Sequence, residues 1–161
     1  MSDHVEVTRA IAAPPGRLWE MVADVTRMGE WSPETESVTW LRGAREPRPG
    51  ASFRGVNRHG TRRWSSVATI VEADPGRVFR FRVKAGGMNV SEWCYRFEPT
   101  AEGCAVTESW TDRRSPLLKV LSRRVTGVTD RASHNREGMA RTLDTLAAAA
   151  EGPSGGGSAP G

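Results

Sequence analysis

Three polar residues occupy positions that the surrounding pattern predicts to be buried. Glu108 and Asn57 each fall in phase with the apolar residues of an alternating strand pattern, and Asn135 falls on the apolar stripe of a predicted helix. Burying such a group without a partner costs about 1–3 kcal/mol. These groups therefore either hydrogen bond within the protein or orient a polar group on a bound ligand.

Of these three residues, Glu108 is the one most able to take part in catalysis. Apolar surroundings disfavour the ionised form of a carboxyl group, which raises its pKa toward neutrality and makes it a candidate general acid or base. A four-residue loop at Pro99–Glu102 places Glu108 opposite Trp93, on the inner face of the sheet. A slip of one residue would place it outside, opposite Cys94. The apolar alternation favours the inner position.

The histidines give little indication of catalysis. His59 lies at the end of a predicted hairpin, where a histidine is usually solvated, and His134 lies one step off the helix stripe. The spacing between His134 and Glu137 is too weak a signal to predict a metal site. The chain also has no G-x-S-x-G, Walker or dinucleotide fingerprint. We therefore expect no metal and no cofactor.

Short strands with alternating apolar residues fill most of the chain. They are predicted at residues 4–11, 37–42, 51–59, 63–72, 78–84, 90–98 and 104–112. Gly60-Thr61 fits a two-residue hairpin that pairs His59 with Arg62 and Asn57 with Trp64. Two short helices are expected between the first two strands, the first opened by Pro15.

The C-terminal part is predicted to be one long amphipathic helix from Pro116 to Glu151, with a possible kink at Gly127. Its apolar stripe recurs at helical spacing, at Leu121, Val125, Val128, Ala132, Asn135, Met139, Leu143, Leu146 and Ala150. Residues 152–161 are mostly Gly, Ser and Pro and are predicted to be a disordered, dispensable tail. Residues 1–151 then form a single domain.

A helix that follows a run of antiparallel strands must bury its stripe against their sheet. The aromatic residues share the inner strand face with this stripe, either as core or as pocket walls. We expect a cavity between sheet and helix, lined by Phe53, Trp64, Phe79, Phe81, Trp93, Tyr95, Trp110, Met139 and Leu143, with Asn57 and Asn135 as polar anchors.

Composition restricts the class of protein. The net charge of +4 comes from dispersed Arg, with no basic run longer than two residues, so no nucleic-acid partner is expected. No secretory signal and no apolar run of about 18 residues is present, which predicts a cytoplasmic protein without stable membrane insertion. Cys94 and Cys104 do not fall opposite one another, so no disulfide is expected.

The order of elements resembles the START-like helix-grip superfamily, also called SRPBCC. Local sequence is similar to its polyketide cyclase/dehydrase-like branch at Ala13-Pro14-Pro15, Trp31-Ser32-Pro33, residues 50–57 (GASFRGVN), Asp74-Pro75-Gly76-Arg77, Trp93-Cys94-Tyr95, Thr107-Glu108-Ser109-Trp110 and residues 135–146 (NREGMARTLDTL). The resemblance implies an α+β fold in which a curved, antiparallel, seven-stranded sheet grips the C-terminal helix around an apolar cavity. It implies binding of lipids, sterols, hormones or polyketides, and in some members aromatic ring cyclisation or dehydration.

Two functions are compatible with these features. The first is binding of a hydrophobic small molecule, either lipid or polyketide-like. The second is a polyketide cyclase or dehydratase that uses Glu108 as general acid or base, with Tyr95, Asn57 or Asn135 polarising an oxygen. An interaction module is a weaker third possibility, because no exposed apolar helix face is predicted. The sequence leaves the ligand and the oligomeric state open.

Overall fold

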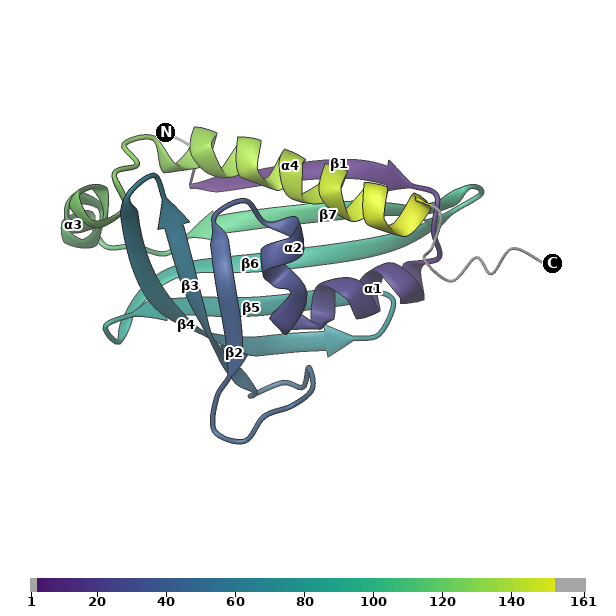
Figure 1. Ribbon diagram of the computed structural model, residues 1–161, viewed down its shortest axis with the longest axis horizontal. Coiled ribbons are helices and arrows are strands. Elements are labelled where there is room, and N and C mark those ends of the chain that lie inside the picture. The colour runs from purple at the N-terminus through teal and green to yellow at the C-terminus, as the bar shows by residue number, and fades with distance from the viewer. Residues whose placement is uncertain (1–2, 153–161) are drawn as a thin grey trace.

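The computed structural model describes residues 3–152, and the chain folds there as the α+β helix-grip architecture that the sequence predicts (Figure 1). The strands are β1 (His4–Ile11), β2 (Thr35–Trp40), β3 (Ser52–His59), β4 (Arg62–Asp74), β5 (Val78–Ala85), β6 (Met88–Thr100) and β7 (Gly103–Asp112). They form one antiparallel seven-stranded sheet in the order β1-β7-β6-β5-β4-β3-β2. Register shifts in the β2–β3, β4–β5 and β5–β6 pairs are the irregularities that bend such a sheet.

Short helices connect β1 to β2: α1 (Pro15–Ala23), the 3₁₀ turn η1 (Val25–Arg27) and α2 (Met28–Trp31). Pro15 opens α1, as expected, because its fixed φ suits the first helical position. Leu18, Trp19 and Val22 are buried on its inner face. The Trp19 indole N–H donates to the Val78 carbonyl at 2.8 Å, which fixes α1 to the start of β5.

The C-terminal part differs from the prediction, because the expected helix of residues 116–151 is two helices. They are α3 (Pro116–Thr126) and α4 (Arg131–Glu151). Gly127 ends α3 with a φ of 73°, a left-handed conformation that glycine adopts without steric penalty. The Asp130 side chain then caps α4 by accepting from the Ser133 amide at 3.1 Å.

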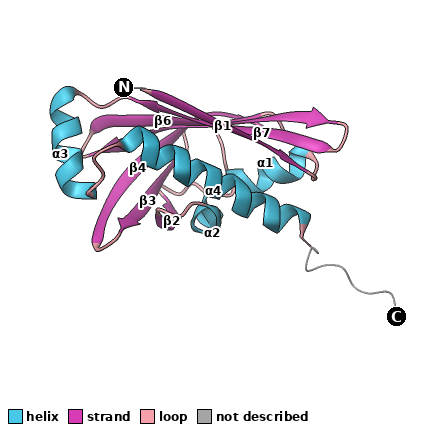
Figure 2. Cartoon of the chain, turned by 90° about the horizontal axis from the view of Figure 1, so that it is seen from above, coloured by secondary structure: helices cyan, strands magenta, loops and turns pink. Residues whose placement is uncertain are grey.

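Figure 2 shows α4 lying along the sheet and α3 at the end opposite the C-terminus. On α4 the predicted stripe is buried at Asn135, Met139, Leu143, Leu146 and Ala150. On α3 the prediction was wrong, since Leu121 and Val125 are 44% and 52% exposed. The absence of an exposed apolar helix face, also expected, is contradicted by the same helix.

The β6–β7 hairpin also differs from the prediction. Pairing continues to Thr100 and Gly103, so the turn is shorter than the four-residue loop expected at Pro99–Glu102. Glu108 therefore lies opposite Tyr95 and not opposite Trp93, a displacement of two positions. A displacement of two keeps every side chain on its predicted face, and Glu108 points inward with 2% of its surface exposed.

Other predictions of pairing hold. The β3–β4 hairpin pairs His59 with Arg62 and Asn57 with Trp64. Cys94 lies opposite Ser109 and Cys104 lies opposite Pro99, so the two cysteines are not cross-strand neighbours. Both are free and buried. Of the predicted tail, Gly152 is described at the end of α4, and residues 153–161 lie outside the described part.

Candidate functional site

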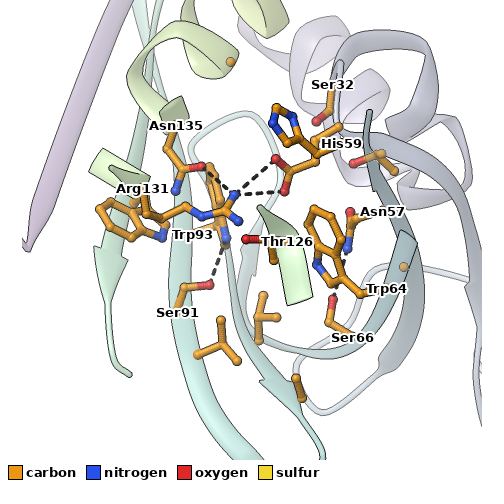
Figure 3. Close-up of a pocket in the computed structure, with 18 of the residues that line it drawn as sticks. Ser32, Asn57, His59, Trp64, Ser66, Ser91, Trp93, Thr126, Arg131 and Asn135 are labelled. Atoms are coloured by element: carbon orange, nitrogen blue, oxygen red, sulfur yellow. Dashed lines mark hydrogen bonds and ion pairs between the residues drawn. The ribbon is translucent and has the colours of Figure 1, made fainter. Parts of the chain in front are cut away.

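A cavity of about 830 Å³ lies between the inner face of the sheet, the loop before β2, and helices α3 and α4. Its wall contains most of the residues predicted for it, namely Phe53, Asn57, Trp64, Phe81, Trp93, Tyr95, Glu108, Trp110, Asn135 and Met139. Such a volume accommodates a small apolar molecule of several rings. Figure 3 shows part of this wall.

Two predicted wall residues belong to the solid core instead. Phe79 is fully buried and packs against Trp19 and Phe81, with ring centroids 6.5 and 5.7 Å apart. Leu143 is likewise fully buried and lies outside the cavity wall. Both belong to the buried apolar cluster that includes Leu18 and Trp19 of α1. Alternation identifies the inner face and does not separate its filled part from its open part.

Glu108 is a buried acidic group in the cavity wall. The Tyr95 hydroxyl donates to its Oε1 at 2.7 Å, while Oε2 is buried and has no hydrogen-bond partner among the described residues. Burial raises the pKa of Glu108 to about 8, against the lowering effect of the Tyr95 hydrogen bond. Burial, and then the charge and hydrogen bond of Glu108, raise the pKa of Tyr95 well above its ordinary value.

These pKa directions make Glu108 and Tyr95 a neutral pair at pH 7. With the carboxyl group protonated, Tyr95 donates to Oε1 and the proton resides on Oε2, without an acceptor. An unsatisfied buried polar atom in a native structure requires a partner such as water or a ligand. The arrangement can donate a hydrogen bond or a proton to an oxygen brought to this wall.

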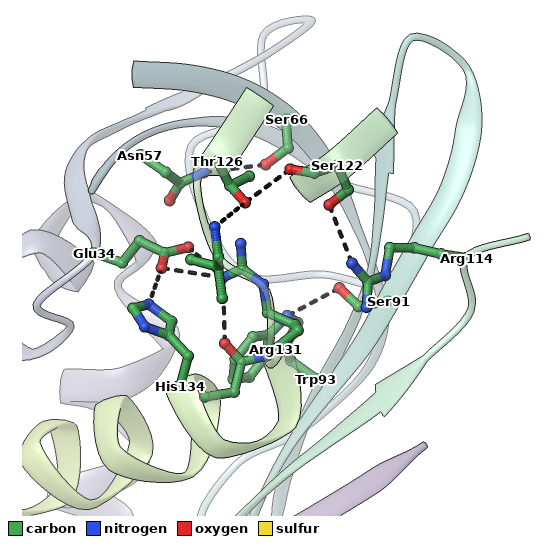
Figure 4. A network of polar contacts seen from close by, with 12 residues as sticks. Glu34, Asn57, Ser66, Ser91, Trp93, Arg114, Ser122, Thr126, Arg131 and His134 are labelled. Carbon is green, nitrogen blue, oxygen red and sulfur yellow. Dashed lines mark hydrogen bonds and ion pairs between the residues drawn. The ribbon is translucent and has the colours of Figure 1, made fainter. Parts of the chain in front are cut away.

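A second polar cluster in the cavity wall joins Glu34, Arg131, His134 and His59. Arg131 Nη1 lies 3.1 Å from both carboxylate oxygens of Glu34, and His134 Nε2 lies 2.6 Å from Oε2 (Figure 4). The His59 ring packs edge-on against His134, with centroids 4.8 Å apart. The guanidinium of Arg131 also lies 5.9 Å from the Trp64 ring centroid, a cation–π distance.

Electrostatics favours the ionised form of Glu34 in this second cluster. Burial acts to raise the pKa of Glu34, but the His134 hydrogen bond and the charge of Arg131 outweigh it and hold the pKa below its ordinary value. Burial lowers the pKa of Arg131, although the charge and hydrogen bond of Glu34 oppose this. The cluster is therefore a charge pair that ties α4 to the loop before β2.

The predicted polar anchors have protein partners. Asn57 Nδ2 donates to Ser66 Oγ at 3.5 Å, and Asn135 Oδ1 accepts from Arg131 at 3.5 Å. Both contacts are at the long limit for a hydrogen bond, so both amides keep capacity for a ligand. Glu108, Asn57 and Trp64 all line the cavity, but the hydrogen bonds of Glu108 and Asn57 go to different partners.

Sequence reasoning missed Glu34 and Arg131 and treated His59 and His134 as peripheral. Glu34 and His134 are 100 residues apart, and no local pattern links them. Among residues 3–152, no group of three His, Cys, Asp or Glu side chains is arranged to hold a metal ion. Within the same range, no helix has the length and apolar character needed to cross a membrane.

Comparison with solved structures supports the fold. Protein CV1439 from Chromobacterium violaceum matches with a TM-score of 0.71 and 14% identity, over 93% of this chain and 99% of that one. The di-domain ARO/CYC protein StfQ of the steffimycin biosynthetic pathway matches with a TM-score of 0.70 and 16% identity, over 92% of this chain and 50% of StfQ. At these identities the likeness establishes the fold alone.

Closer sequence similarity identifies the family. The Polyketide_cyc-like protein Cgl2372 from Corynebacterium glutamicum is 31% identical, with a TM-score of 0.59, over 91% of this chain and 90% of that one. No curated protein matches the chain significantly. The model of the family described as polyketide cyclase / dehydrase and lipid transport matches residues 2–151. The chain therefore belongs to the polyketide cyclase / dehydrase and lipid transport family, within the START-like helix-grip fold.

Proposed function

We propose that this protein binds a hydrophobic small molecule, lipid or polyketide-like, in the cavity between the sheet and α4. The ligand's apolar body lies against the aromatic wall, and a ligand carbonyl accepts a hydrogen bond from Glu108. The observation that carries the proposal is the unpartnered Oε2 of a buried carboxyl group whose pKa is about 8. A neutral acid with a donor that no protein group accepts is a recognition element for a carbonyl oxygen.

The test uses prodan, a naphthalene ketone, as a fluorescent probe. Because only protonated Glu108 donates to the ketone, prodan affinity should be constant below the pKa of about 8 and fall up to about tenfold per pH unit above it. In Glu108→Gln the amide donates at every pH, so the affinity should stay within a few-fold of the wild type at pH 7 and lose this dependence. A matched control ligand, 2-dimethylaminonaphthalene, lacks the ketone and should show no pH dependence.

Two outcomes contradict the proposal. If prodan does not bind, or if other apolar molecules do not displace it, the cavity is not a binding site. If the pH dependence persists unchanged in Glu108→Gln, another group recognises the carbonyl. Native mass spectrometry of the purified protein, searching for a co-purified small molecule, gives the chemical class of the natural ligand independently of the probe.

The second candidate function is a polyketide cyclase or dehydratase with Glu108 as general acid or base. It is favoured by the same pKa, which lies near neutrality as proton transfer requires, and by the Tyr95 hydroxyl 2.7 Å from Oε1. The fold neighbour StfQ is described as an ARO/CYC protein. Turnover of a poly-keto substrate should fall by about two to four orders of magnitude in Glu108→Gln. Full activity in this variant would exclude Glu108 as the proton-transfer group.

A further inference from the structure

Large apolar side chains are exposed mainly at one end of the molecule. Among residues 3–152 there are six such side chains, and four of them are on α3: Leu117 (69% exposed), Val120 (52%), Val125 (52%) and Leu121 (44%). A fifth, Met88 (47%), lies at the β5–β6 turn. Single exposed apolar residues are normal in proteins, whereas a group of them marks a surface that contacts something else.

This apolar surface is continuous with the cavity. Leu121, Val125 and Met88 line the cavity as well as being exposed. Leu117 and Val120 lie outside the cavity wall and extend the apolar face of α3 outward. Leu117 is four residues before Leu121 and three before Val120, so the helix places it beside both. We call Leu117, Val120, Leu121, Val125 and Met88 the mouth surface. A molecule leaving the cavity at this end would pass along it.

The helix is held to the protein by its opposite side, so the mouth surface stays free. Leu118 is buried, and Arg114 Nη1 donates to Ser122 Oγ at 3.1 Å. Arg62 reaches from the start of β4 and donates to the main-chain carbonyl of Arg124. These contacts fix α3 against the sheet without using Leu117 or Val120.

The charge around the mouth surface is positive. Helix α3 carries Lys119, Arg123 and Arg124 and has no acidic residue. Lys119 lies 3.4 Å from Asp3, but Arg62, Arg123 and Arg124 pair with no carboxylate in the described part of the chain. An exposed apolar face with basic flanks is typical of helices that lie in the interface of an anionic membrane.

We propose that the mouth surface docks on an anionic lipid membrane, which allows an apolar ligand to pass between the bilayer and the cavity. Charge complementarity favours this partner over a second copy of the chain, because a symmetric contact through α3 would bring the same unpaired cations together. A nucleic acid would match the charge but would leave the apolar residues exposed. Docking stands on these exposed side chains alone, and ligand exchange rests on the proposed function.

Vesicle flotation tests the docking directly. The full chain is mixed with phosphatidylcholine vesicles with and without phosphatidylglycerol, at salt concentrations of about 0.1 M and about 1 M, between which the Debye length falls from about 10 to about 3 Å. The protein should float with the anionic vesicles at low salt and bind the neutral vesicles much more weakly. High salt should reduce its binding to the anionic vesicles. An absence of binding to anionic vesicles, or binding indifferent to lipid charge and salt, would overturn the proposal.

Variants of the mouth surface locate the contact. Leu117→Gln and the double variant Arg123→Glu/Arg124→Glu should each weaken binding, the double variant about tenfold or more. The matched controls are Val71→Gln, at an exposed apolar residue of β4, and Arg17→Glu, at an exposed cation of α1. Circular dichroism checks that each variant is folded. Equal binding by the mouth variants and the controls would contradict the proposal.

Two further measurements separate the possible failures. If Leu117→Gln dissociates a dimer in analytical ultracentrifugation while the wild type ignores vesicles, the mouth surface binds a second copy and the membrane proposal is wrong. Prodan binding, measured without vesicles, reports on the cavity independently. Prodan binding without vesicle binding refutes membrane docking but leaves the proposed function intact, whereas vesicle binding without prodan binding refutes the proposed function and supports docking.

Discussion

The stability of the folded protein should depend on pH through Glu108. Its pKa is about 8 in the folded state, because it is buried, and 4.5 is the ordinary value expected in the unfolded chain. Between these pH values the unfolded state loses the proton that the folded state keeps. The free energy of unfolding must therefore fall as the pH rises through this window. The contribution is complete below about pH 4.5 and is lost as the pH rises through about 8.

The two pKa values set the size of the effect. Each pH unit inside the window is worth about 1.4 kcal/mol for one proton, so the total approaches about 5 kcal/mol. That is a large part of the stability of a typical domain. Glu108→Gln keeps the shape of the side chain and an acceptor for Tyr95 but cannot ionise. Relative to the wild type, the variant should therefore gain several kcal/mol between pH 5 and pH 9.

Urea denaturation at a series of pH values measures this difference. Because every other group titrates in both proteins, subtracting the wild-type free energy of unfolding from that of Glu108→Gln isolates Glu108. The matched control is Glu102→Gln, at an exposed carboxylate of the β6–β7 turn, which should follow the wild type at every pH. A difference between Glu108→Gln and wild type that stays constant from pH 5 to pH 9 would refute the assignment of a buried, protonated acid.

Two further substitutions test the elements that frame the cavity. Glu34→Ala leaves Arg131 and His134 without their carboxylate and should lower the free energy of unfolding by about 3 kcal/mol; Glu34→Ala/Arg131→Met should recover most of this loss. Because the pKa of Glu34 is below its ordinary value, its contribution is present above about pH 4.5 and lost as the pH falls, and no loss in acid would contradict the ion pair. Gly127→Ala should lower the free energy of unfolding by about 1–2 kcal/mol, because φ of Gly127 is 73° and a Cβ there would lie 2.8 Å from Arg62 Cδ. Gly127→Asn should cost less, and equal stability of Ala and Gly would contradict the strain.

Strand positions were predictable because every second residue of a strand points to the buried face. The first strand has the predicted bounds, residues 4–11, and the hairpin at Gly60-Thr61 has the predicted register. The β6–β7 turn was misplaced because proline lacks an N–H and usually ends a strand. Here the ladder between β5 and β6 ends at Arg96, so Pro99 lies beyond it and its missing donor breaks no pair there.

The division of the C-terminal helix could not be seen in the periodicity. The break between α3 and α4 covers residues 127–130, close to one helical turn of 3.6 residues. The apolar stripe therefore keeps its phase across the break and is indistinguishable from that of a continuous helix. Only Gly127 signalled the boundary, and one glycine inside a helical pattern is compatible with a kink. As a result, Leu121 and Val125 were predicted to be buried, whereas both are exposed and belong to the mouth surface.

The position of Glu108 was predictable from the sequence, and the cluster around Glu34 was not. Glu108 could be placed from its phase with Val106 and Trp110, which parity alone supplies. Glu34 precedes β2, where no alternation defines a face, and its partners Arg131 and His134 are on α4. Nothing short of the three-dimensional fold brings these segments together. The available signal was the i, i+4 spacing of Arg131 and Asn135 along one helix face, which is too common to predict a site.

The two carboxyl groups of the cavity show how partners set chemistry. Glu34 faces a guanidinium and is held ionised, whereas Glu108 has no cation beside it and burial holds it protonated, against the lowering effect of the Tyr95 hydrogen bond. Exchanging these environments would exchange the states, because the residue type is the same. A ligand beside the Glu34–Arg131 pair meets charges that are already paired and contribute little attraction. At Glu108 it meets a donor without an acceptor. Under the proposed function, Glu108 therefore supplies the selectivity for a carbonyl, and a bound molecule should be oriented with its carbonyl at Glu108 and its apolar end toward the mouth surface.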